Sequence, residues 1–353
     1  MRRPTRRGVV AAGLVALTLQ TAAAQSVATK PDTSPIPPLF EKETPLAITF
    51  TANLRRLKSD KDSNAPWRAA TIAYAADTGR VVIPAKARTR GIWRLKNCYF
   101  PPLRLDFAGK DTKGTVFQRL GKPKLVNYCR DTDPYEQYIL QEFQLYRIYQ
   151  LLTPVSNRVR LLRVAYVDSA SGDTDATRYA FIAEDPEHLA KRFNGIVVKT
   201  KGATVSDLEP ENLALAYLFQ LLIGNTDFSF NGIHNTQLIA TADGRLLPVA
   251  YDFDYAGAVN TSYAVPPQNY NVPNVRTRKF MGYCEIAGEY PNALAKFIAK
   301  KDAIYALYAD TVGKLMKPDV VKRTLEYFDD FYNDVRTPKD AERNVFSKCI
   351  RAR

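Results

Sequence analysis

Residues Leu221–Gly257 read LLIGNTDFSFNGIHNTQLIATADGRLLPVAYDFDYAG, and this stretch carries the clearest indications of the fold. Its apolar start indicates a buried helix that ends at Gly224, and a polar loop follows. After this loop, short apolar runs on either side of an Asp-Gly turn predict a hairpin with strands at Thr236–Ile239 and Leu246–Ala250. The stretch therefore predicts a helix, a loop and a hairpin in direct succession.

Polar side chains flank this hairpin and define a candidate site. Asn235 directly precedes its first strand and Asp252 follows its second, so both are expected to lie close together, near Asp227 in the preceding loop. Two carboxylates and an amide offer oxygen ligands, which suit a hard cation such as Mg²⁺. The order matches phosphoryl-transfer sites, in which one Asp orients the accepting group while an Asn and a second Asp hold metal on the phosphates.

The sequence allows three alternatives for this site. Asp254 is a rival to Asp252 for the metal-binding role, because two acids flank Phe253. The same residues are also compatible with loops that are only capped and tied by Asp and Asn side chains. Hydrolysis by the paired carboxylates of Asp227 and Asp252 is a further alternative, although the aromatic context of a sugar-binding site is missing.

The rest of the 353-residue chain indicates an α+β protein, with a sheet-rich first half and a mainly helical second half. Strands are predicted at Leu46–Asn53, Ala69–Ala75, Val81–Ile83, Ala87–Leu95, Leu103–Phe107, Pro123–Tyr128, Val159–Val167 and Arg178–Ala183. One long helix lies among them, with Asp133 as its N-cap and Thr153-Pro154 as its stop. Further helices are predicted at Pro210–Ile223, Asn292–Leu307 and Pro318–Asp334.

Several segments resemble the spore-coat protein H (CotH) family of atypical, protein-kinase-like proteins. In the family's order they are Arg88-Thr-Arg90-Gly91, Lys122-Pro-Lys124-Leu125, the acidic helix with Glu142, Tyr179–Glu184, Asn225-x-Asp227, His234-Asn235 and Tyr251-Asp252-Phe253-Asp254. Cys98–Pro102 and Gly224–Ser229 look more like an uncharacterised branch of exported bacterial proteins. The chain departs from protein kinases in having no GxGxxG loop and in the spacing of Asp227 and Asn235, which are 235 − 227 = 8 positions apart.

The resemblance implies a two-lobed protein-kinase-like fold. Its sheet-rich N-lobe, with one long helix, would span residues 46–190, and its mainly helical C-lobe would span residues 191–353. The implied activity is Mg²⁺- and ATP-dependent phosphoryl transfer to an unidentified acceptor, either a protein or an anionic component of the cell envelope. Because the bacterial periplasm is not an obvious source of ATP, the alternative is a catalytically inactive kinase-like binding module of the envelope.

The resemblance also implies a role for each site residue. Asp227 would be the catalytic acid of the loop. The residues implied to hold Mg²⁺ or Mn²⁺ are Asn235, Asp252 and Asp254. Lys124 would grip the phosphates of ATP and pair with Glu142, and Arg90 would cover the phosphates. The structural alternatives are a solubilising strand residue for Lys124 and a residue at the rim of the helix for Glu142.

The N-terminus and the cysteines indicate an exported, periplasmic or secreted protein. Residues 1–24 combine a basic start, an apolar run and a small-residue end, which is typical of a signal peptide, and residues 25–45 form a Pro-, Thr- and Ser-rich lead-in. No later stretch is expected to span a membrane. Four cysteines allow two disulfides with three connectivities, and their clustering favours Cys98–Cys129 and Cys284–Cys349; a buried free thiol is the alternative.

The charge pattern bears on the partners. The formal net charge of +14 falls to +10 when the four arginines among the first seven residues are removed, since 14 − 4 = 10. Lysine and arginine are spread along the chain without a tight block or interleaved aromatics, which argues against nucleic acid and favours attraction to anionic envelope polymers or phospholipid surfaces. Only two histidines are present, which argues against histidine-based triads and multi-histidine metal sites and leaves carboxylate and amide chemistry.

Overall fold

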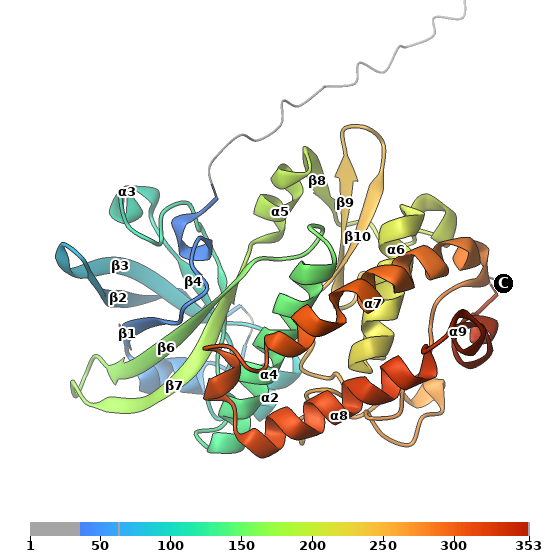
Figure 1. The fold of residues 1–353 in the computed structure, drawn as a ribbon. Coiled ribbons are helices and arrows are strands. Elements are labelled where there is room, and N and C mark those ends of the chain that lie inside the picture. Colours follow the sequence, from blue (N-terminus) through green and yellow to red (C-terminus); the bar gives the residue numbers. More distant parts are fainter. Residues whose placement is uncertain (1–35, 63, 352–353) are drawn as a thin grey trace, which may run out of the picture.

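The protein is described here by a computed structural model that covers residues 36–62 and 64–351. The expected signal peptide and the first part of the expected lead-in lie outside the described residues. The end of the lead-in contains the short 3-10 helix η1 (Pro38–Phe40), in which Leu39 is buried. The chain then forms an α+β protein, in which a closed barrel is followed by a largely helical C-terminal part (Figure 1).

Seven strands from the first half of the chain form the barrel. They are β1 (Leu46–Ala52), β2 (Arg68–Ala76), β3 (Gly79–Thr89), β4 (Leu103–Asp106), β5 (Lys124–Val126), β6 (Val159–Asp168) and β7 (Thr174–Ala183). Their order is β1-β2-β3-β4-β5-β7-β6, and β6 closes the barrel by pairing in parallel with β1, while the other neighbours are antiparallel. Ile48, Phe50 and Ala52 alternate inward along β1, as the two-residue period of a strand requires, and contribute to the apolar core of the barrel.

The predicted sheet-rich first half is confirmed, and the parallel pairing of β1 with β6 closes its otherwise antiparallel sheet into a barrel. The strand predicted over Ala87–Leu95 is wrong in its second half: β3 ends at Thr89, Gly91 turns the chain at φ 93°, and Trp93–Asn97 forms helix α2. A short apolar run is compatible with either structure, and here the left-handed glycine separates the two.

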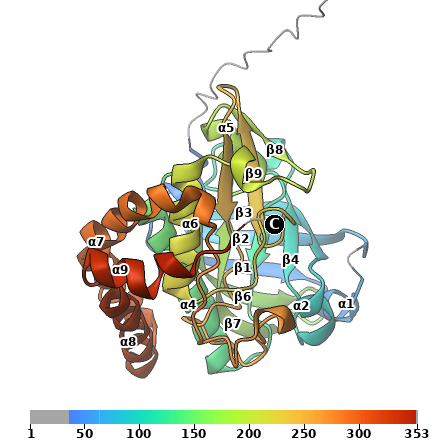
Figure 2. The same ribbon diagram turned by 90° about the vertical axis from the view of Figure 1, so that its right-hand side faces the viewer.

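The long helix α4 (Asp133–Leu152) lies between the barrel and the C-terminal helices (Figures 1 and 2). It packs against β6 and β7 on one side and against α6 (Pro210–Ile223) and α7 (Tyr290–Ala306) on the other. Most of its residues are therefore buried, and the buried set includes Glu142 and Arg147 as well as its apolar side chains. The helix begins one residue earlier than predicted, because Thr132 and not Asp133 is the N-cap.

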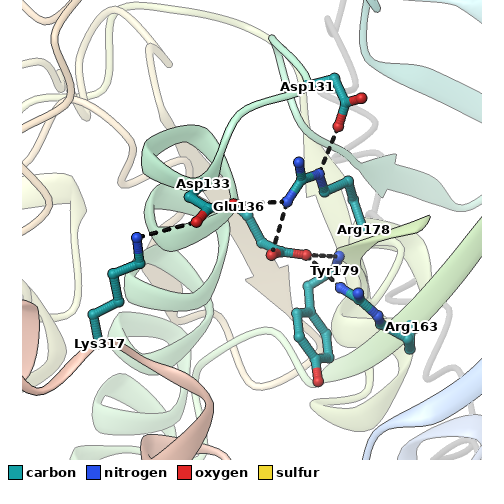
Figure 3. Close-up of polar contacts among 7 residues, drawn as sticks. All are labelled: Asp131, Asp133, Glu136, Arg163, Arg178, Tyr179 and Lys317. Carbon is teal, nitrogen blue, oxygen red and sulfur yellow. Dashed lines mark hydrogen bonds and ion pairs between the residues drawn. The ribbon is translucent and has the colours of Figure 1, made fainter. Parts of the chain in front are cut away.

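An ion-pair network fixes the first turn of α4 in place (Figure 3). The side chain of Glu136 accepts hydrogen bonds from the side chain of Arg163 on β6 and from the backbone N–H of Tyr179 on β7. Arg178 on β7 pairs with Glu136 at 3.3 Å and with Asp131 and Asp133 at 2.6 and 3.2 Å. Lys317, the N-cap of α8 (Pro318–Asp334), reaches Asp133 at 3.1 Å. These contacts tie α4 to the barrel and to the C-terminal helices at once.

The C-terminal part combines a small sheet with helices. The sheet has the order β10-β9-β8, with β8 (Gly195–Val198), β9 (Thr236–Thr241) and β10 (Leu246–Ala250) all antiparallel. Its helices are α6 (Pro210–Ile223), α7 (Tyr290–Ala306), α8 (Pro318–Asp334) and α9 (Pro338–Asn344), with the 3-10 turns η2 (Val205–Asp207), η3 (Gln268–Tyr270), η4 (Cys284–Glu289), η5 (Gly313–Leu315) and η6 (Phe346–Lys348). The remaining short helices are α1 (Leu54–Ser59), α3 (Gly109–Thr112) and α5 (Pro186–Arg192). A second apolar core unites α5, α6, α7, α8 and α9 with α4.

The helix predictions for this part are largely confirmed. The bounds of α6 and α8 match the predicted ranges, and α7 begins at Tyr290, two residues before its predicted start. The predicted hairpin is present as β9 and β10. Strand β8 is an addition that the sequence pattern did not predict, because it is only four residues long.

Both predicted disulfides are present. Cys98 is bonded to Cys129 and Cys284 to Cys349, so no free cysteine remains. Two disulfides are consistent with an oxidising, extracytoplasmic compartment. Within residues 36–62 and 64–351, no helix has both the length and the apolar character needed to cross a membrane.

Candidate functional site

The loop that carries the candidate site begins where α6 ends. Gly224 caps the helix with φ 66°, and a Cβ at this position would lie 1.9 Å from the hydroxyl oxygen of Tyr327. Only glycine therefore allows the chain to turn here against Tyr327. Immediately afterwards, the side-chain oxygen of Asn225 accepts a hydrogen bond from the backbone N–H of Asp227 at 3.0 Å, which shapes the loop around Asp227.

Asp227, His234 and Asn235 form one hydrogen-bonded cluster. The amide nitrogen of Asn235 donates to the carboxylate of Asp227 at 2.9 Å and to its backbone carbonyl at 2.8 Å. His234 Nε2 lies 2.8 Å from the other carboxylate oxygen of Asp227. Asn235 thus contacts Asp227 through its amide nitrogen. Its side-chain oxygen, the atom that a cation would need, takes no part in these two hydrogen bonds. The predicted proximity of Asp227 and Asn235 is confirmed.

The hairpin brings Asp252 to the same place. The backbone N–H of Tyr251 donates to the carbonyl of Asn235 at 3.1 Å, so the end of β10 lies beside the start of β9. Asp252 itself is anchored to α4, because its backbone N–H donates to the hydroxyl of Tyr146 at 2.9 Å. The expectation that the two ends of the hairpin meet at this site is therefore confirmed.

The backbone is strained at three positions of this site. Ile233, Asn235 and Asp252 have φ values of 47°, 49° and 64°. Asn and Asp tolerate the left-handed region better than other side chains, but a β-branched isoleucine there is an outlier. Such conformations persist only where the surrounding structure imposes them, and they concentrate at functional sites.

Three carboxylates gather on the α4 side of the site. Glu142 is 2 % exposed and Asp254 is 7 % exposed, whereas Asp252 is half-buried. Burial, together with the charges of Asp254 and Asp252, raises the pKa of Glu142 well above its usual range. Burial and the charge of Asp252 likewise raise the pKa of Asp254 to about 7. A cation would stabilise the ionised forms of this cluster, because both burial and like charges now oppose them.

The geometry of the acids limits how a metal could bind. Across the described ranges 36–62 and 64–351, no group of three or more His, Cys, Asp or Glu side chains is arranged to hold a metal ion. The hydroxyl of Tyr263 also donates to Asp254 at 3.0 Å, so this carboxylate already has a partner. The donor chemistry nevertheless fits Mg²⁺, which commonly takes one or two carboxylates and completes its shell with water and substrate phosphates.

Cationic side chains face these acids from the barrel. Arg90 follows β3, Arg94 lies on α2 and Lys124 lies on β5. The Nε atoms of Arg90 and Arg94 are buried and have no hydrogen-bond partner among the described residues. Burial and the neighbouring charge of Arg90 lower the pKa of Lys124 to about 8. Desolvated cations that have no ion-pair partner among the described residues fit an anionic group such as a phosphate.

The predicted pairing of Lys124 with Glu142 is not found. No ion pair joins them in the part of the chain that the structure describes; the ammonium of Lys124 instead lies 4.6 Å from the centre of the Tyr251 ring. The acid is buried on α4, where the nearby cation with the largest effect on its pKa is Arg94. The expected strand-to-helix ion pair is thus replaced by a cation–π contact.

Four of the predicted site residues nevertheless line one cavity at the junction of the barrel and the C-terminal part. They are Arg90, Lys124, Glu142 and Asp252. The cavity has a volume of about 30 Å³, with Tyr146 and Tyr251 also in its wall. The other three, Asp227, Asn235 and Asp254, lie outside its lining. The space is far below the roughly 300–1,000 Å³ of ordinary ligand pockets.

Sequence reasoning missed several members of the site. Arg94 was assigned to a strand, and Tyr263 lies in a segment with no distinctive pattern. Tyr146 could have been found, because it lies four residues after Glu142 and therefore on the same helix face. In comparisons with known proteins, no family model and no curated sequence matches this chain.

Proposed function

We propose that this protein is an exported, atypical kinase-like protein that transfers a phosphoryl group from Mg²⁺- or Mn²⁺-bound ATP to an acceptor. The observation that carries the proposal is the convergence of Arg90, Lys124, Glu142 and Asp252 on one cavity. These residues come from β3, β5, α4 and the end of the β9–β10 hairpin, which are distant in the sequence. Such convergence of buried opposite charges needs a functional reason, because unpaired buried charge destabilises a fold.

The proposal assigns each residue a task. Asp252 would hold the cation with the side-chain oxygen of Asn235, and Asp254 is the neighbouring acid that would replace Asp252 in this role. The cation would supply charge neutralisation on the phosphates when it is bound. Lys124 and Arg90 would bind phosphate oxygens from the barrel side. Asp227 would accept the proton of the acceptor hydroxyl and orient it, with its carboxylate held by Asn235 and His234.

The proposal extends to the fold. A sheet-rich N-terminal part, a long helix against it and a helical C-terminal part correspond to the two-lobed kinase-like arrangement implied by the sequence motifs. Two features support this correspondence: the site lies where the two parts meet, and α4 places Glu142 there. The closed barrel, with its parallel pairing of β1 and β6, is a departure from an open kinase sheet.

The small cavity favours the alternative function, a catalytically inactive kinase-like binding module of the envelope. A space of about 30 Å³ admits a water molecule or an ion but not a nucleotide. An active enzyme would need Tyr251 and Lys124, which now pack on each other, to separate when the nucleotide enters. The acceptor under either function would be a protein or an anionic component of the envelope.

A labelled-phosphate assay separates the two functions. The full mature chain is incubated with ATP labelled at the γ-phosphate and with Mg²⁺ or Mn²⁺, alone and with envelope extract, and the label is followed on protein, on extract and as free phosphate. The active enzyme predicts transfer by the wild type and by the control Asp302→Asn, an exposed acid on α7. Asp227→Asn should bind nucleotide but lose transfer. Binding without transfer by the wild type would establish the inactive module.

A further inference from the structure

A second cavity lies next to the candidate centre and has four cationic side chains in its wall. It has a volume of about 360 Å³ and is bounded by the loops before β5 and β6 and by α5. Its charged residues are Arg119, Arg158, Lys191 and Arg192, together with a single carboxylate, Glu184. One acid therefore faces four cations in the wall of one cavity.

Glu184 neutralises only part of this charge. Its carboxylate accepts a hydrogen bond from Arg192 at 2.6 Å and one from the backbone N–H of Arg158 at 3.1 Å. The Arg158 guanidinium stays 3.8 Å from the other carboxylate oxygen, which is buried without a hydrogen bond. Within residues 36–62 and 64–351, no ion pair involves Arg119 or Lys191, so two of the cations have no acidic partner.

The wall also holds polar atoms that point to a missing ligand. The Nε of Arg119 and the Nδ1 of His188 are buried and have no partner among the described residues. Arg119 has a left-handed φ of 66°, which is strained for a residue with a side chain. Burial and the nearby charge of Arg192 lower the pKa of Arg158, so the cations are held together against their mutual repulsion. An anion would supply an acceptor for the Nε of Arg119 and reduce the repulsion among the cations.

We propose that this cavity binds a phosphate group carried by a compact molecule. Guanidinium groups match the oxygens of phosphate in fork geometry, and a lysine adds a mobile point charge. The volume leaves room for a phosphate with an attached group about the size of one sugar ring. The proposal does not depend on kinase activity. Glu184 lines both cavities, so the new site shares a wall with the candidate centre.

The test is titration calorimetry of the mature chain with inorganic phosphate and with a hexose phosphate, at low salt and with a chelator present to remove divalent cations. We expect binding to the wild type, and we expect Lys191→Gln and Arg158→Gln each to weaken it about tenfold. Lys191 is exposed and carries no ion pair in the described structure, so its variant should fold normally. Lys300→Gln, which removes one exposed cation from α7, is the matched control and should bind like the wild type.

Two further variants locate the site. Glu184→Gln removes the only carboxylate of the cavity and should bind phosphate more tightly, an effect opposite in sign to that of the cation variants. Lys124→Gln, in the candidate centre, separates the two sites, because phosphate binding that this variant retains and that Lys191→Gln and Arg158→Gln weaken belongs to the new cavity. Loss of phosphate binding in Lys124→Gln, with normal binding in Lys191→Gln and Arg158→Gln, would place the anion in the candidate centre and overturn the proposal.

The source of the phosphate is tested with vesicles of phosphatidylglycerol against vesicles of phosphatidylcholine. Binding that depends on Lys191 and Arg158 and occurs only with phosphatidylglycerol vesicles would assign a lipid headgroup. Binding of the free hexose phosphate through the same residues would assign a soluble ester. Absence of binding to phosphate, hexose phosphate and vesicles at millimolar concentration would refute the proposal.

Discussion

The carboxylate of Asp254 gives the site a pH dependence that a single substitution isolates. Its pKa is raised to about 7 in the folded protein by burial and by the charge of Asp252, against 3.8 for the ordinary side chain. Between about pH 5 and pH 7 the folded chain keeps a proton that the unfolded chain has lost. The unfolded state binds fewer protons in this window, so the free energy of unfolding falls as the pH rises.

The size of the effect follows from the two pKa values. Each pH unit costs about 1.4 kcal/mol while the folded group stays protonated and less as it ionises near pH 7, so this one group should cost the folded state about 2.3 kcal/mol between pH 5 and pH 7. Asp254→Asn removes the titration and keeps an oxygen that can accept the hydrogen bond from Tyr263. The difference between wild type and variant should therefore grow by about 2.3 kcal/mol across the window, in favour of the variant at pH 7.

The assay is urea unfolding of both proteins at pH 5, 6 and 7 with a chelator present. Titrating groups outside this cluster contribute equally to both proteins, so the difference between the two curves reports on Asp254 and on Glu142, whose pKa the charge of Asp254 raises. Saturating Mg²⁺ should reduce the difference, because a bound cation favours the ionised carboxylate. A difference that stays constant from pH 5 to pH 7 would refute the reasoning that Asp254 is held protonated by burial and by Asp252.

Two further predictions concern the scaffold. Gly224→Ala should lower the free energy of unfolding by about 3 kcal/mol or more, because the left-handed backbone costs an alanine ~1–2 kcal/mol and its Cβ would displace Tyr327. The control Gly114→Ala, at φ 74° with open space around it, should show the backbone cost alone. Equal losses of stability in the two variants would contradict the steric argument. Replacing Cys284 and Cys349 together by serine should lower the free energy of unfolding by about 4 kcal/mol in denaturant titrations, because their disulfide closes a loop between cysteines 65 positions apart in the sequence. Free thiols at these positions in the wild-type protein, detected by mass mapping, would contradict the assigned pairing.

Local signals explain which parts of the fold could be predicted. The ends of α6 are marked by Pro210 and Gly224, and the β9–β10 turn by an Asp-Gly pair, so these bounds can be read directly. The closure of the barrel depends on the pairing of β1 with β6, which lie more than 100 residues apart in the sequence. No local pattern encodes such a contact. The four-residue strand β8 likewise forms by pairing with β9, which no local pattern in its own sequence indicates.

The site also combines features that local sequence predicts with features that depend on distant segments. Chain order and the hairpin were sufficient to bring Asp252 beside Asn235 and Asp227. The convergence of Arg90, Lys124 and Glu142 on one cavity with Asp252 was implied by the family resemblance and agrees with the structure. The details of pairing could not be predicted, because they depend on rotamers and on neighbours from distant segments. The sequence contains no indication that Lys124 packs on Tyr251 in place of pairing with Glu142.

The central claim, that Asp252 helps to hold a divalent cation on a nucleotide at this site, is tested most directly by calorimetric titration with a non-hydrolysable ATP analogue. The titration is run with Mg²⁺, with Mn²⁺ and with a chelator, on the wild type, on Asp252→Asn and on the control Asp302→Asn. Asparagine tolerates the left-handed backbone of residue 252, so this variant should remain folded. We expect cation-dependent binding by the wild type and the control and its loss in Asp252→Asn. Absence of binding by the wild type under every condition, or equal binding by Asp252→Asn, would contradict the account.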